Sequence, residues 1–371
     1  MKKIVYVVKN KLHYYPPCVS QIRMLKDLNY DVDVLYGTSN DKIINILKHN
    51  GINCIQIPNV SDNNTNKIKK VKNWLDYRKS MTRIFENYDK NVIFWFGTAE
   101  SALPLLGKLK YKKYVCFVLE LMDEYKLKLH FLGKIMRNAK AVCVCEQTRA
   151  YLQKYWWHLK KVPYVFPNKP YKNNDTFSNL KNDQLNIALK KIGNSKYILY
   201  QGILQNKEEL IEIAKALNYT KNRYKLVLMG IDKYKSVNEI KKYYKNLVYI
   251  EYIPAPLHLE ITKRAHIGIA YYRPDSLNKV FCAPNKIYEY SGFGIPMLCN
   301  DVPGLTNTVG NVNAAKCINI TTENVIKAID CIDENYEKYK SNAINFFNST
   351  DNLYTMNELL KNLKENDVIN K

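Results

Sequence analysis

The segment Ala283–Leu298, with the sequence APNKIYEYSGFGIPML, carries the signals of a helix, a helix end and a buried strand in direct succession. Pro284 suits the first turn of a helix, because the N–H group that proline lacks would be unpaired there. Gly292 and Gly294 are typical of a helix end, where glycine tolerates left-handed backbone. The apolar run at residues 295–299 predicts a short buried strand. The segment is therefore predicted to be a short helix followed by a buried strand.

The predicted helix is polar where a helix of a protein core would be apolar. Asn285, Lys286 and Glu289 lie three and four residues apart, so the three side chains share one face near the helix N-terminus. That end carries a partial positive charge and free N–H groups, and Lys286 adds a full charge. A phosphate group fits there, and Glu289 can accept hydrogen bonds from hydroxyl groups attached to it. The alternative interpretation is an ordinary Lys–Glu surface pair, which is common and weak.

The sequence PNKIYEYSGFGIPML resembles the signature segment of GT-B glycosyltransferases of the retaining, family-four kind, also called glycosyl transferases group one. In that family the Glu of this helix binds the ribose hydroxyls of the nucleotide sugar, and the helix start faces the diphosphate. The resemblance therefore implies that Glu289 binds ribose, with Asn285 and Lys286 beside it in the donor site. Many members carry a second Glu eight positions earlier, where this chain has Phe281. The donor-sugar contacts of that Glu must then come from elsewhere.

Apolar runs alternate with helical patterns along the whole chain. The runs at residues 4–8, 31–36 and 54–57 are typical of strands, and a second series begins at residues 197–200. This βαβαβ order predicts open, doubly wound parallel sheets. The length of 371 residues favours two domains over a single core. The sequence predicts an α/β protein with two Rossmann-like domains, and the resemblance implies that they face a cleft, as in the GT-B fold.

The same patterns predict where the domains begin and end. Residues 1–170 are expected to form the first Rossmann-like domain and residues 196–345 the second, and the resemblance assigns them to the acceptor and to the nucleotide sugar. Residues 171–195 are rich in Asn, Lys, Asp and Ser, which is typical of a linker, and a short helix is expected within it near residues 185–191. Residues 346–371 are expected to contain a helix that packs back on the N-terminal domain, as the last helix of GT-B proteins commonly does.

The loop at residues 201–210 joins the first strand and the first helix of the second predicted domain. In the family this loop carries basic residues for the diphosphate, often an Arg just after the Gly and a Lys or Arg a few positions on. Gly202 and Lys207 match two of these positions, whereas Ile203 stands where the Arg would be. The resemblance implies that Lys207 contacts the diphosphate. Without the resemblance, Lys207 would be interpreted as a solvated surface residue.

Three further residues are placed in the donor site. Ile253 precedes the turn at residues 254–257, which the resemblance places near the nucleotide base. Arg273 follows the predicted strand at residues 267–271 and can approach the donor, and the alternative for it is an exposed surface loop. Gly304 lies in a polar turn at a strand end, where the missing side chain allows close approach of a backbone.

Glu120 and Asp123 follow the predicted strand at residues 114–119. In family members this place often reads acid-x-His-Glu. Glu120 and Asp123 match the acidic positions, and Met122 stands where the His would be. Either carboxylate can position an acceptor hydroxyl, or act as the base that an inverting reaction needs. The alternative, which the residues alone favour, is a structural role such as capping the following helix.

These residues predict a glycosyltransferase that moves a sugar from a nucleoside diphosphate, expected to be UDP, to a saccharide acceptor. Negative charge builds on the departing diphosphate, and Lys207, Lys286 and the helix start would stabilise that charge. The resemblance implies a retaining reaction. No Asp-x-Asp pair or histidine cluster demands a metal, so we expect neither a metal nor a cofactor.

Other functions fit parts of the same pattern. Nucleotide-sugar epimerases share the two-domain fold and need no separate acceptor. A catalytically inactive scaffold of polysaccharide assembly also fits, because Phe281, Met122 and Ile203 are apolar at positions that are polar in the family. A nucleic-acid binder is a poor alternative, since only the net charge favours it and no nucleic-acid motif is visible.

The composition indicates which partners and which cellular compartment to expect. The formal net charge of +23 favours anionic partners such as a phospholipid surface or phosphorylated substrates. The nine cysteines have neither disulfide nor metal-ligand spacing, which predicts a reducing compartment. The apolar run at residues 4–8 is too short for a signal peptide, and no apolar run reaches the ~20 residues of a spanning helix. We therefore expect a cytoplasmic protein.

Two stretches of the first predicted domain mix basic and aromatic residues, namely residues 125–132 (YKLKLHFL) and 155–158 (YWWH). Such stretches can lie on an anionic membrane, where extended Lys side chains and interfacial Trp are both favoured. This predicts a peripheral protein on the inner face of the cell membrane that acts on a lipid-linked precursor of a bacterial surface polysaccharide. The alternative is a solvated helix face with buried aromatic side chains.

Overall fold

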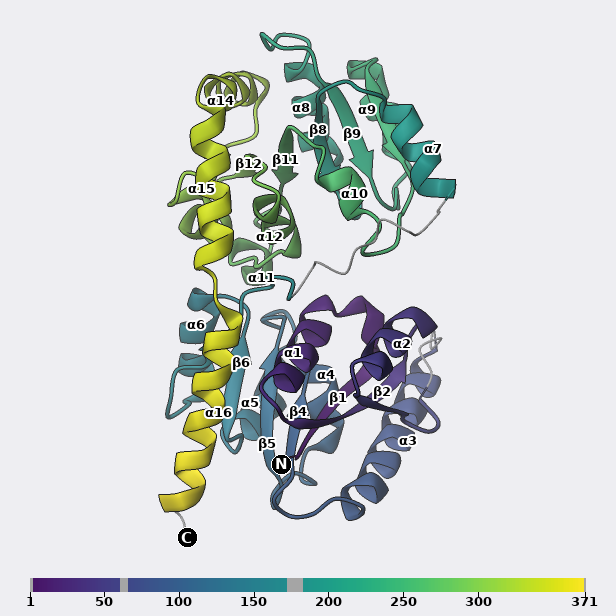
Figure 1. Ribbon diagram of the computed structural model, residues 1–371, viewed down its shortest axis with the longest axis vertical. Coiled ribbons are helices and arrows are strands. Elements are labelled where there is room, and N and C mark those ends of the chain that lie inside the picture. The colour runs from purple at the N-terminus through teal and green to yellow at the C-terminus, as the bar shows by residue number, and fades with distance from the viewer. Residues whose placement is uncertain (1–2, 61–65, 172–182, 370–371) are drawn as a thin grey trace. The chain divides into compact units, whose positions relative to one another are not determined.

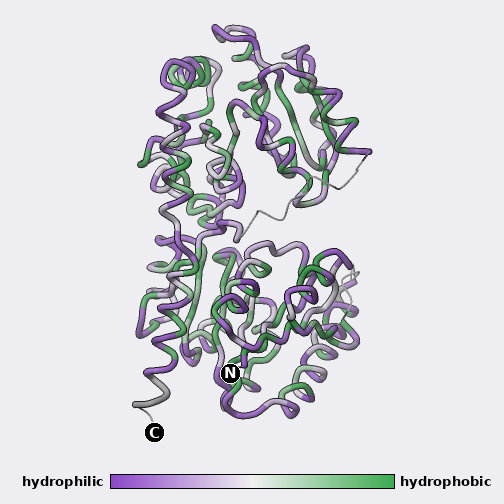
Figure 2. Tube along the Cα trace, in the orientation of Figure 1, coloured by the Kyte–Doolittle hydropathy of each residue, from purple (hydrophilic) through white to green (hydrophobic). Residues whose placement is uncertain are grey.

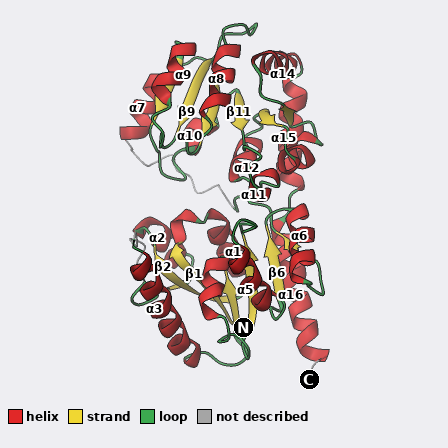
Figure 3. Ribbon diagram, turned by 180° about the vertical axis from the view of Figure 1, so that it is seen from behind, coloured by secondary structure: helices red, strands yellow, loops and turns green. Residues whose placement is uncertain are grey.

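The computed structural model of the chain describes residues 3–60, 66–171 and 183–369 (Figure 1). The chain divides into two compact units. The first comprises residues 1–172 and 351–371, and the second comprises residues 173–350. Each unit contains its own parallel sheet with helices on both faces (Figures 1 and 3).

The sheet of the first unit has the strand order β3-β2-β1-β4-β5-β6-β7, and its neighbouring strands are parallel. The strands are β1 (Lys3–Lys11), β2 (Asp31–Thr38), β3 (Asn53–Gln56), β4 (Ile93–Phe96), β5 (Lys113–Val118), β6 (Ala141–Val144) and β7 (Tyr164–Val165). The helices are α1 (Pro16–Asp27), α2 (Asp41–His49), α3 (Lys67–Glu86), α4 (Ala99–Ala102), α5 (Lys126–Met136), α6 (Gln147–Trp157) and α16 (Asn352–Ile369), with 3₁₀ turns η1 (Leu12–Tyr14) and η2 (Leu103–Leu105). Residues 4–8 of β1 are all 0% exposed, because helices cover both faces of the sheet.

The sheet of the second unit has the order β10-β9-β8-β11-β12-β13, again with parallel neighbours. The strands are β8 (Tyr197–Gln201), β9 (Lys225–Met229), β10 (Leu247–Ile250), β11 (Ile267–Ala270), β12 (Met297–Asn300) and β13 (Ala315–Ile318). The helices are α7 (Asp183–Ile192), α8 (Lys207–Ala216), α9 (Val237–Tyr243), α10 (Leu259–Thr262), α11 (Leu277–Val280), α12 (Asn285–Gly292), α13 (Pro303–Leu305), the π-helical turn η4 (Thr306–Gly310), α14 (Thr322–Glu334) and α15 (Tyr336–Ser349).

In each sheet the first three strands extend the sheet in one direction from its first strand. The later strands extend it in the other direction. The switch point between the two directions lies between β1 and β4 in the first unit and between β8 and β11 in the second. At such a point the connections after the two strands leave in opposite directions and open a crevice at the carboxyl ends. These ends are therefore the places to search for a ligand site.

Alternate residues of β8 face two different cores. Tyr197 and Leu199 join an apolar cluster with α7, α12 and α15, whereas Ile198 and Tyr200 join a cluster with α8, α9 and α14. Hydropathy follows this layering, with apolar strands inside and polar helix surfaces outside (Figure 2). The two doubly wound parallel sheets predicted from the βαβαβ order are therefore confirmed.

The boundary regions contain more helix than the composition indicates. The predicted linker at residues 171–195 includes α7, and its Leu185, Ala188 and Ile192 pack in the core of the second unit. The short helix expected near residues 185–191 is therefore confirmed, with one to two further residues at its ends. Residues 172–182 of that linker lie outside the described residues.

The predicted last segment, residues 346–371, is divided between the units. Its first residues continue α15 in the second unit, and α16 belongs to the first unit. The Asn352 side chain donates from Nδ2 to the carbonyl oxygen of Pro167 at 2.8 Å, and Asn362 donates from Nδ2 to the Tyr164 hydroxyl group at 2.9 Å. These bonds attach α16 to the last strand of the first sheet and to the chain that follows it.

Gly230 is predicted to be essential for the loop that follows β8. Its φ is +139°, and an added β-carbon would lie 2.0 Å from the carbonyl oxygen of Gly202. We expect Gly230→Ala to lower the free energy of unfolding by about 3 kcal/mol, the upper range for strained backbone sites. Gly193→Ala is the matched control, because Gly193 also has positive φ (+64°) but its β-carbon would meet only Lys225 Nζ at 3.8 Å. Urea denaturation tests this, and equal losses for the two variants would contradict it.

Candidate functional site

Tyr290 fixes helix α12 at the switch point of the second sheet. Its ring packs against Gly268 of β11, where an added β-carbon would lie 2.6 Å from ring atoms. Its hydroxyl group donates to the carbonyl oxygen of Leu199 in β8 at 3.1 Å, and the carbonyl oxygen of Ile269 in β11 lies 3.3 Å away. The helix is thereby held across the two strands that border the crevice.

The ends of α12 agree with the local sequence signals to within one residue. Pro284 occupies the N-cap position, with extended backbone at φ −76° and ψ 144°, rather than the first turn. The helix ends at Gly292, and Gly294 follows with φ +67°. The N–H group of Ile295 then donates to the carbonyl oxygen of Tyr290 at 3.0 Å, which closes the helix.

The Lys286 ammonium group lies between two aromatic rings at the carboxyl ends of β8 and β11. Its Nζ is 4.8 Å from the centroid of the Tyr200 ring and 5.3 Å from that of Tyr272. It also lies 3.5 Å from the place that a β-carbon of Gly202 would occupy. Among residues 3–60, 66–171 and 183–369, none forms a hydrogen bond or an ion pair with Lys286. Aromatic faces attract a cation, but no carboxylate neutralises this one.

Burial lowers the pKa of Lys286 to about 8, and the negative charge of Glu289 opposes this shift. Water is largely withdrawn from the ammonium group, although the residue as a whole is partly exposed. A charged group without water or a counter-ion is costly to bury. An anion bound beside Lys286 would recover that cost, so the site favours a negatively charged ligand.

Glu289 lies one turn along α12 from Lys286, and its carboxylate is held by residues of two other elements. Gln201, the last residue of β8, donates from Nε2 to Glu289 Oε2. Thr262 of α10 donates from Oγ1 to Gln201 Oε1 at 2.8 Å. His258, just before α10, has its Nε2 3.5 Å from the same Glu289 Oε2. One oxygen of the carboxylate is thus occupied by the protein.

Lys207 is the first residue of α8, and its Nζ pairs with Glu239 Oε2 of α9 at 2.9 Å. This pair raises the pKa of Lys207. Among the described residues of the second unit, no hydrogen bond or ion pair connects Lys207 to Lys286 or Glu289. Lys207 and Lys286 were predicted to act together, but they differ in how their charge is compensated. Lys207 forms an ion pair with Glu239, whereas Lys286 forms no ion pair with the described residues.

Arg273, predicted to approach the donor, is instead bound to two carboxylates of α8. Its Nη2 lies 2.8 Å from Glu208 Oε2 and 3.2 Å from Glu209 Oε2. These hydrogen bonds raise the pKa of Arg273. Glu209 also accepts a hydrogen bond from the Tyr271 hydroxyl group at 2.7 Å. The guanidinium group is exposed but already neutralised in this structure.

The other predicted donor-site residues have varied surroundings. Asn285 is the first residue of α12 and is half-buried. Gly304 is buried, and an added β-carbon would lie 2.4 Å from backbone atoms of Cys282, so the close approach there is to the chain that leads into α12. Ile253 is 4% exposed and belongs to the core that also contains Ile287 of α12.

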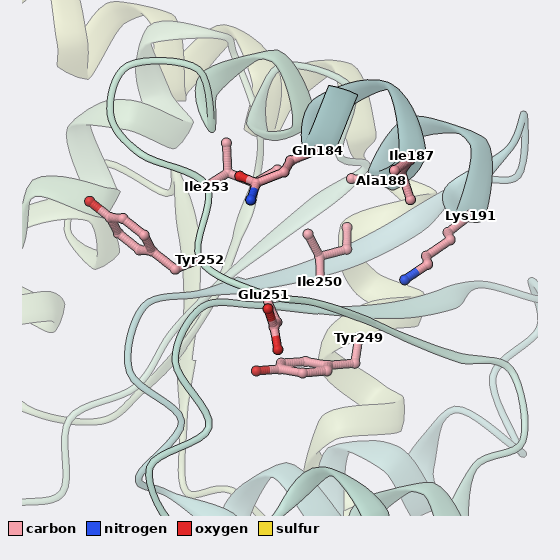
Figure 4. A pocket seen from close by; sticks show the side chains of 9 residues that line it. All are labelled: Gln184, Ile187, Ala188, Lys191, Tyr249, Ile250, Glu251, Tyr252 and Ile253. Atoms are coloured by element: carbon pink, nitrogen blue, oxygen red, sulfur yellow. The ribbon is translucent and has the colours of Figure 1, made fainter. Parts of the chain in front are cut away.

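Ile253 also lines a hollow of about 290 Å³ between α7 and the end of β10 (Figure 4). Its lining residues come from α7 and from β10 and the residues after it: Gln184, Ile187, Ala188, Lys191, Tyr249, Ile250, Glu251, Tyr252 and Ile253. Lys286, Glu289 and Gly202 do not line it. The hollow is therefore separate from the charged residues of α12.

One of the two predicted acidic residues of the first unit, Glu120, interacts with a third carboxylate. Glu120 is exposed and Asp123 is half-buried, in the loop between β5 and α5. Tyr125 occupies the N-cap position of α5, so neither Glu120 nor Asp123 is the N-cap residue of this helix. Burial raises the pKa of Glu100, in the first turn of α4, and the negative charge of Glu120 adds to the shift. Glu100 follows β4 at the switch point of this sheet.

The two basic and aromatic stretches differ in exposure. In α5 and just before it, Tyr125, Leu127 and Phe131 are exposed. In the second stretch, Tyr155 is exposed but Trp157 is 2% exposed and packs in the core. For Trp157 the alternative of a buried aromatic side chain is therefore confirmed, because this side of α6 faces the sheet.

The described residues contain neither a metal-binding cluster nor a membrane-spanning helix. Across residues 3–60, 66–171 and 183–369, no group of three or more His, Cys, Asp or Glu side chains is arranged to hold a metal ion. None of the helices in these ranges is long and apolar enough to cross a bilayer. The one Asp-x-Asp sequence in β2, Asp31 and Asp33, binds Lys3 at 3.2 and 3.0 Å.

Gln201, Thr262 and His258 were not predicted as site residues. Gln201 directly precedes Gly202, which was predicted to bind the donor. Its position at the end of the strand could therefore have indicated that it lies near the site. Thr262 and His258 lie far from both segments in sequence, and no spacing rule connects them to Glu289. Only the packing of α10 against α12 brings them there.

No protein-family model matches the chain, and no curated protein sequence matches it. Solved structures do match it. HepE from Anabaena, in complex with UDP-glucose, has a TM-score of 0.69 at 11% identity and covers 98% of this chain and 100% of its own. WaaG, a glycosyltransferase involved in lipopolysaccharide biosynthesis, has a TM-score of 0.61 at 11% identity, over 96% of this chain and 98% of its own.

A putative UDP-N-acetylglucosamine 2-epimerase from Listeria monocytogenes has a TM-score of 0.66 at 12% identity, over 99% of this chain and 97% of its own. The chain has the GT-B fold. This confirms the predicted fold class of two Rossmann-like parallel-sheet domains. At these identities the likeness establishes the fold alone. A proposed function therefore depends on the residues of the site.

Removing the buried charge of Lys286 should stabilise the protein. The pKa of Lys286 is about 8 in the folded state, against the ordinary lysine value of 10.5, so the unfolded chain binds the proton more tightly. The destabilisation is complete below pH 8 and disappears as the pH rises to 10.5. We expect Lys286→Met to raise the free energy of unfolding by about 1–2 kcal/mol at pH 7, and by less at pH 10.

Lys207→Met is the matched control, because its ion pair raises the pKa of Lys207 and its removal cannot stabilise the protein in this way. Chemical denaturation at pH 7 and pH 10 measures both variants. A Lys286→Met variant less stable than the wild type at pH 7 would show that the ammonium group is compensated in the free protein.

Proposed function

We propose that the protein is a glycosyltransferase that moves a sugar from a nucleoside diphosphate, linked to uridine, to a saccharide acceptor. The observation that carries this proposal is the unneutralised Lys286 ammonium group at the switch point between β8 and β11. It lies beside the Gly202 loop, and Glu289 is one turn along the same helix. A positive group and an acceptor at this spacing suit a ligand that has both phosphate and hydroxyl groups.

The same groups supply what the reaction needs. When the bond between sugar and diphosphate breaks, negative charge develops on the departing phosphate. Lys286 and the free N–H groups at the start of α12 would stabilise that charge, and they are already in place. Because water is withdrawn from Lys286, its attraction for a phosphate is stronger than it would be at an open surface. Diphosphate binding would also restore the pKa of Lys286 toward its usual value.

Lys207 is the second cation of this proposal. It is held by Glu239, so it must exchange this carboxylate for the diphosphate when the donor binds. On the acceptor side, Glu120, Asp123 and Glu100 are the candidates for binding an acceptor hydroxyl. A retaining outcome follows only from the family resemblance and belongs to the proposal.

The solved structures support a UDP-linked donor. HepE holds UDP-glucose in its structure, and WaaG acts in lipopolysaccharide biosynthesis. A nucleotide-sugar 2-epimerase is the second candidate function, because a putative enzyme of this kind has the same fold. Incubating the protein with a nucleotide sugar and no acceptor distinguishes the two, since only an epimerase converts the donor under those conditions.

The acceptor is proposed to be lipid-linked, and helix α5 is the proposed membrane contact. Leu127 is 76% exposed on this helix, and Phe131 lies four residues further along. Lys126 and Lys128 lie beside them, with Lys128 Nζ 4.4 Å from the centroid of the Tyr125 ring. Exposed apolar and aromatic side chains with flanking lysines suit the interface of an anionic bilayer.

Lys286→Ala should lower turnover by ~100-fold, in line with the loss of other groups that stabilise transition-state charge. A thermal-shift screen of UDP-, GDP- and ADP-sugars identifies the donor, and turnover is then measured with it. Lys215→Ala is the control, because the Lys215 ammonium group pairs with Glu212 of its own helix and lies over the Tyr243 ring of α9. Undiminished turnover in Lys286→Ala would remove the charge-stabilising role.

Charge reversal on α5 should release the protein from anionic vesicles. Each Lys near such a surface contributes about 1 kcal/mol, so the double variant Lys126→Glu/Lys128→Glu should bind roughly 30-fold more weakly. Lys241→Glu/Lys242→Glu, on exposed positions of α9, makes the same change in net charge and should have little effect. Co-sedimentation with vesicles containing phosphatidylglycerol measures both, and equal effects would attribute binding to net charge alone.

A further inference from the structure

We propose that Gln201, Thr262 and His258 are positioning residues that set the preference of the site for ribose over 2′-deoxyribose, by presenting one defined oxygen of Glu289. This inference rests on the proposed function, in which Glu289 binds the ribose of a nucleoside diphosphate. It assigns a role to residues of β8 and α10 that would not themselves touch the ligand.

The orientation of the Gln201 amide follows from its two neighbours. A carboxylate only accepts hydrogen bonds, so the NH₂ group of Gln201 must face Glu289. The amide oxygen then faces Thr262, whose hydroxyl group donates to it at 2.8 Å. Gln201 is 5% exposed and Thr262 is 0% exposed, so water does not compete for these bonds. The hydrogen bonds therefore run in one direction, with Thr262 donating to Gln201 and Gln201 donating to Glu289.

His258 acts on the same oxygen of Glu289. Its Nε2 is 3.5 Å from Glu289 Oε2, and its Nδ1 is buried without a hydrogen-bond partner among the described residues. A proton on Nδ1 would leave a buried N–H group unpaired and would turn a lone pair of Nε2 toward the carboxylate, so the neutral ring carries its proton on Nε2. Nε2 lies on the side of the carboxylate that carries Oε2, the oxygen that already accepts from Gln201.

Glu289 Oε1 is the oxygen that remains. In the described part of the chain no hydrogen bond or ion pair reaches it, whereas Oε2 faces both Gln201 and His258. A carboxylate with one oxygen fixed cannot rotate freely, so Oε1 keeps one position beside the crevice. A ribose hydroxyl placed there would find an acceptor that is already oriented, and 2′-deoxyribose would leave that charged acceptor without its donor.

The loss of a hydrogen bond to a charged acceptor predicts that the wild type binds a ribonucleoside diphosphate roughly 10–100-fold more tightly than its 2′-deoxy counterpart. The test uses UDP, GDP and ADP with their 2′-deoxy forms, by isothermal titration, and follows the pair that contains the tightest ribonucleotide. Glu289→Ala should bind the ribonucleotide more weakly and lose the preference. Gln201→Leu and Thr262→Val should reduce the preference to a few-fold while the 2′-deoxy form binds nearly as before.

The controls separate positioning from general damage. Thr322→Val removes a similar Thr hydroxyl bond, to Glu212 Oε2 at 2.6 Å, and should leave the preference unchanged. His258→Gln keeps a donor near the place of Nε2 and should retain more of the preference than His258→Leu. If Gln201→Leu does not fold, Thr262→Val alone tests whether these residues position Glu289. This variant is expected to fold, because it replaces one hydroxyl group with a methyl group of similar size.

Three results would overturn the inference. A wild type that binds the ribo and 2′-deoxy forms equally would show that Glu289 does not read the ribose. An unchanged preference in Gln201→Leu and Thr262→Val, with nucleotide binding intact, would show that these residues do not position it. A wild type that binds none of the nucleotides would overturn the proposed function itself, which distinguishes that failure from the first two.

Discussion

The contact between Tyr290 and the two central strands of the second sheet determines where the charged groups of α12, Lys286 and Glu289, lie. The ring fills the space over Gly268, and the hydroxyl group bonds to the backbone of β8 beside β11. Because these strands border the switch point, α12 starts over the crevice that the fold opens there. Lys286 and Glu289 occupy its first two turns and are carried to the crevice with it. A protein interior is packed too closely for this helix to shift without disturbing both groups.

The cations around this crevice differ in how their charge is compensated. Lys207 and Arg273 are bound to carboxylates of neighbouring helices, so the protein itself satisfies them. Lys286 faces two tyrosine rings instead, and burial lowers its pKa to about 8. Groups with strongly perturbed pKa values are concentrated at functional sites, because free energy lost in folding is recovered when the ligand binds. In the proposed function, Lys286 is therefore a stronger indication of the phosphate position than Lys207 or Arg273.

The local features of this protein were determined by its sequence alone. Continuous apolar runs such as residues 4–8 predict strands covered on both faces, and their alternation with helical patterns predicts two doubly wound sheets. The helix at α12 and its glycine end follow from neighbouring residues, because helix termini depend on backbone groups only a few positions apart. That Lys286 and Glu289 share a face follows in the same way from their spacing.

The contacts between elements were decided by the tertiary structure. Gln201 and His258 meet Glu289 because β8 lies beside β11 and α10 packs against α12. Neither arrangement can be predicted from the residues of a single segment. The ion pairs of Lys207 and Arg273 depend in the same way on which helices become neighbours. The direction of Trp157 into the core depends on which side of α6 meets the sheet. Spacing along the chain fixes what lies on one helix face, whereas partners across elements depend on strand order and packing.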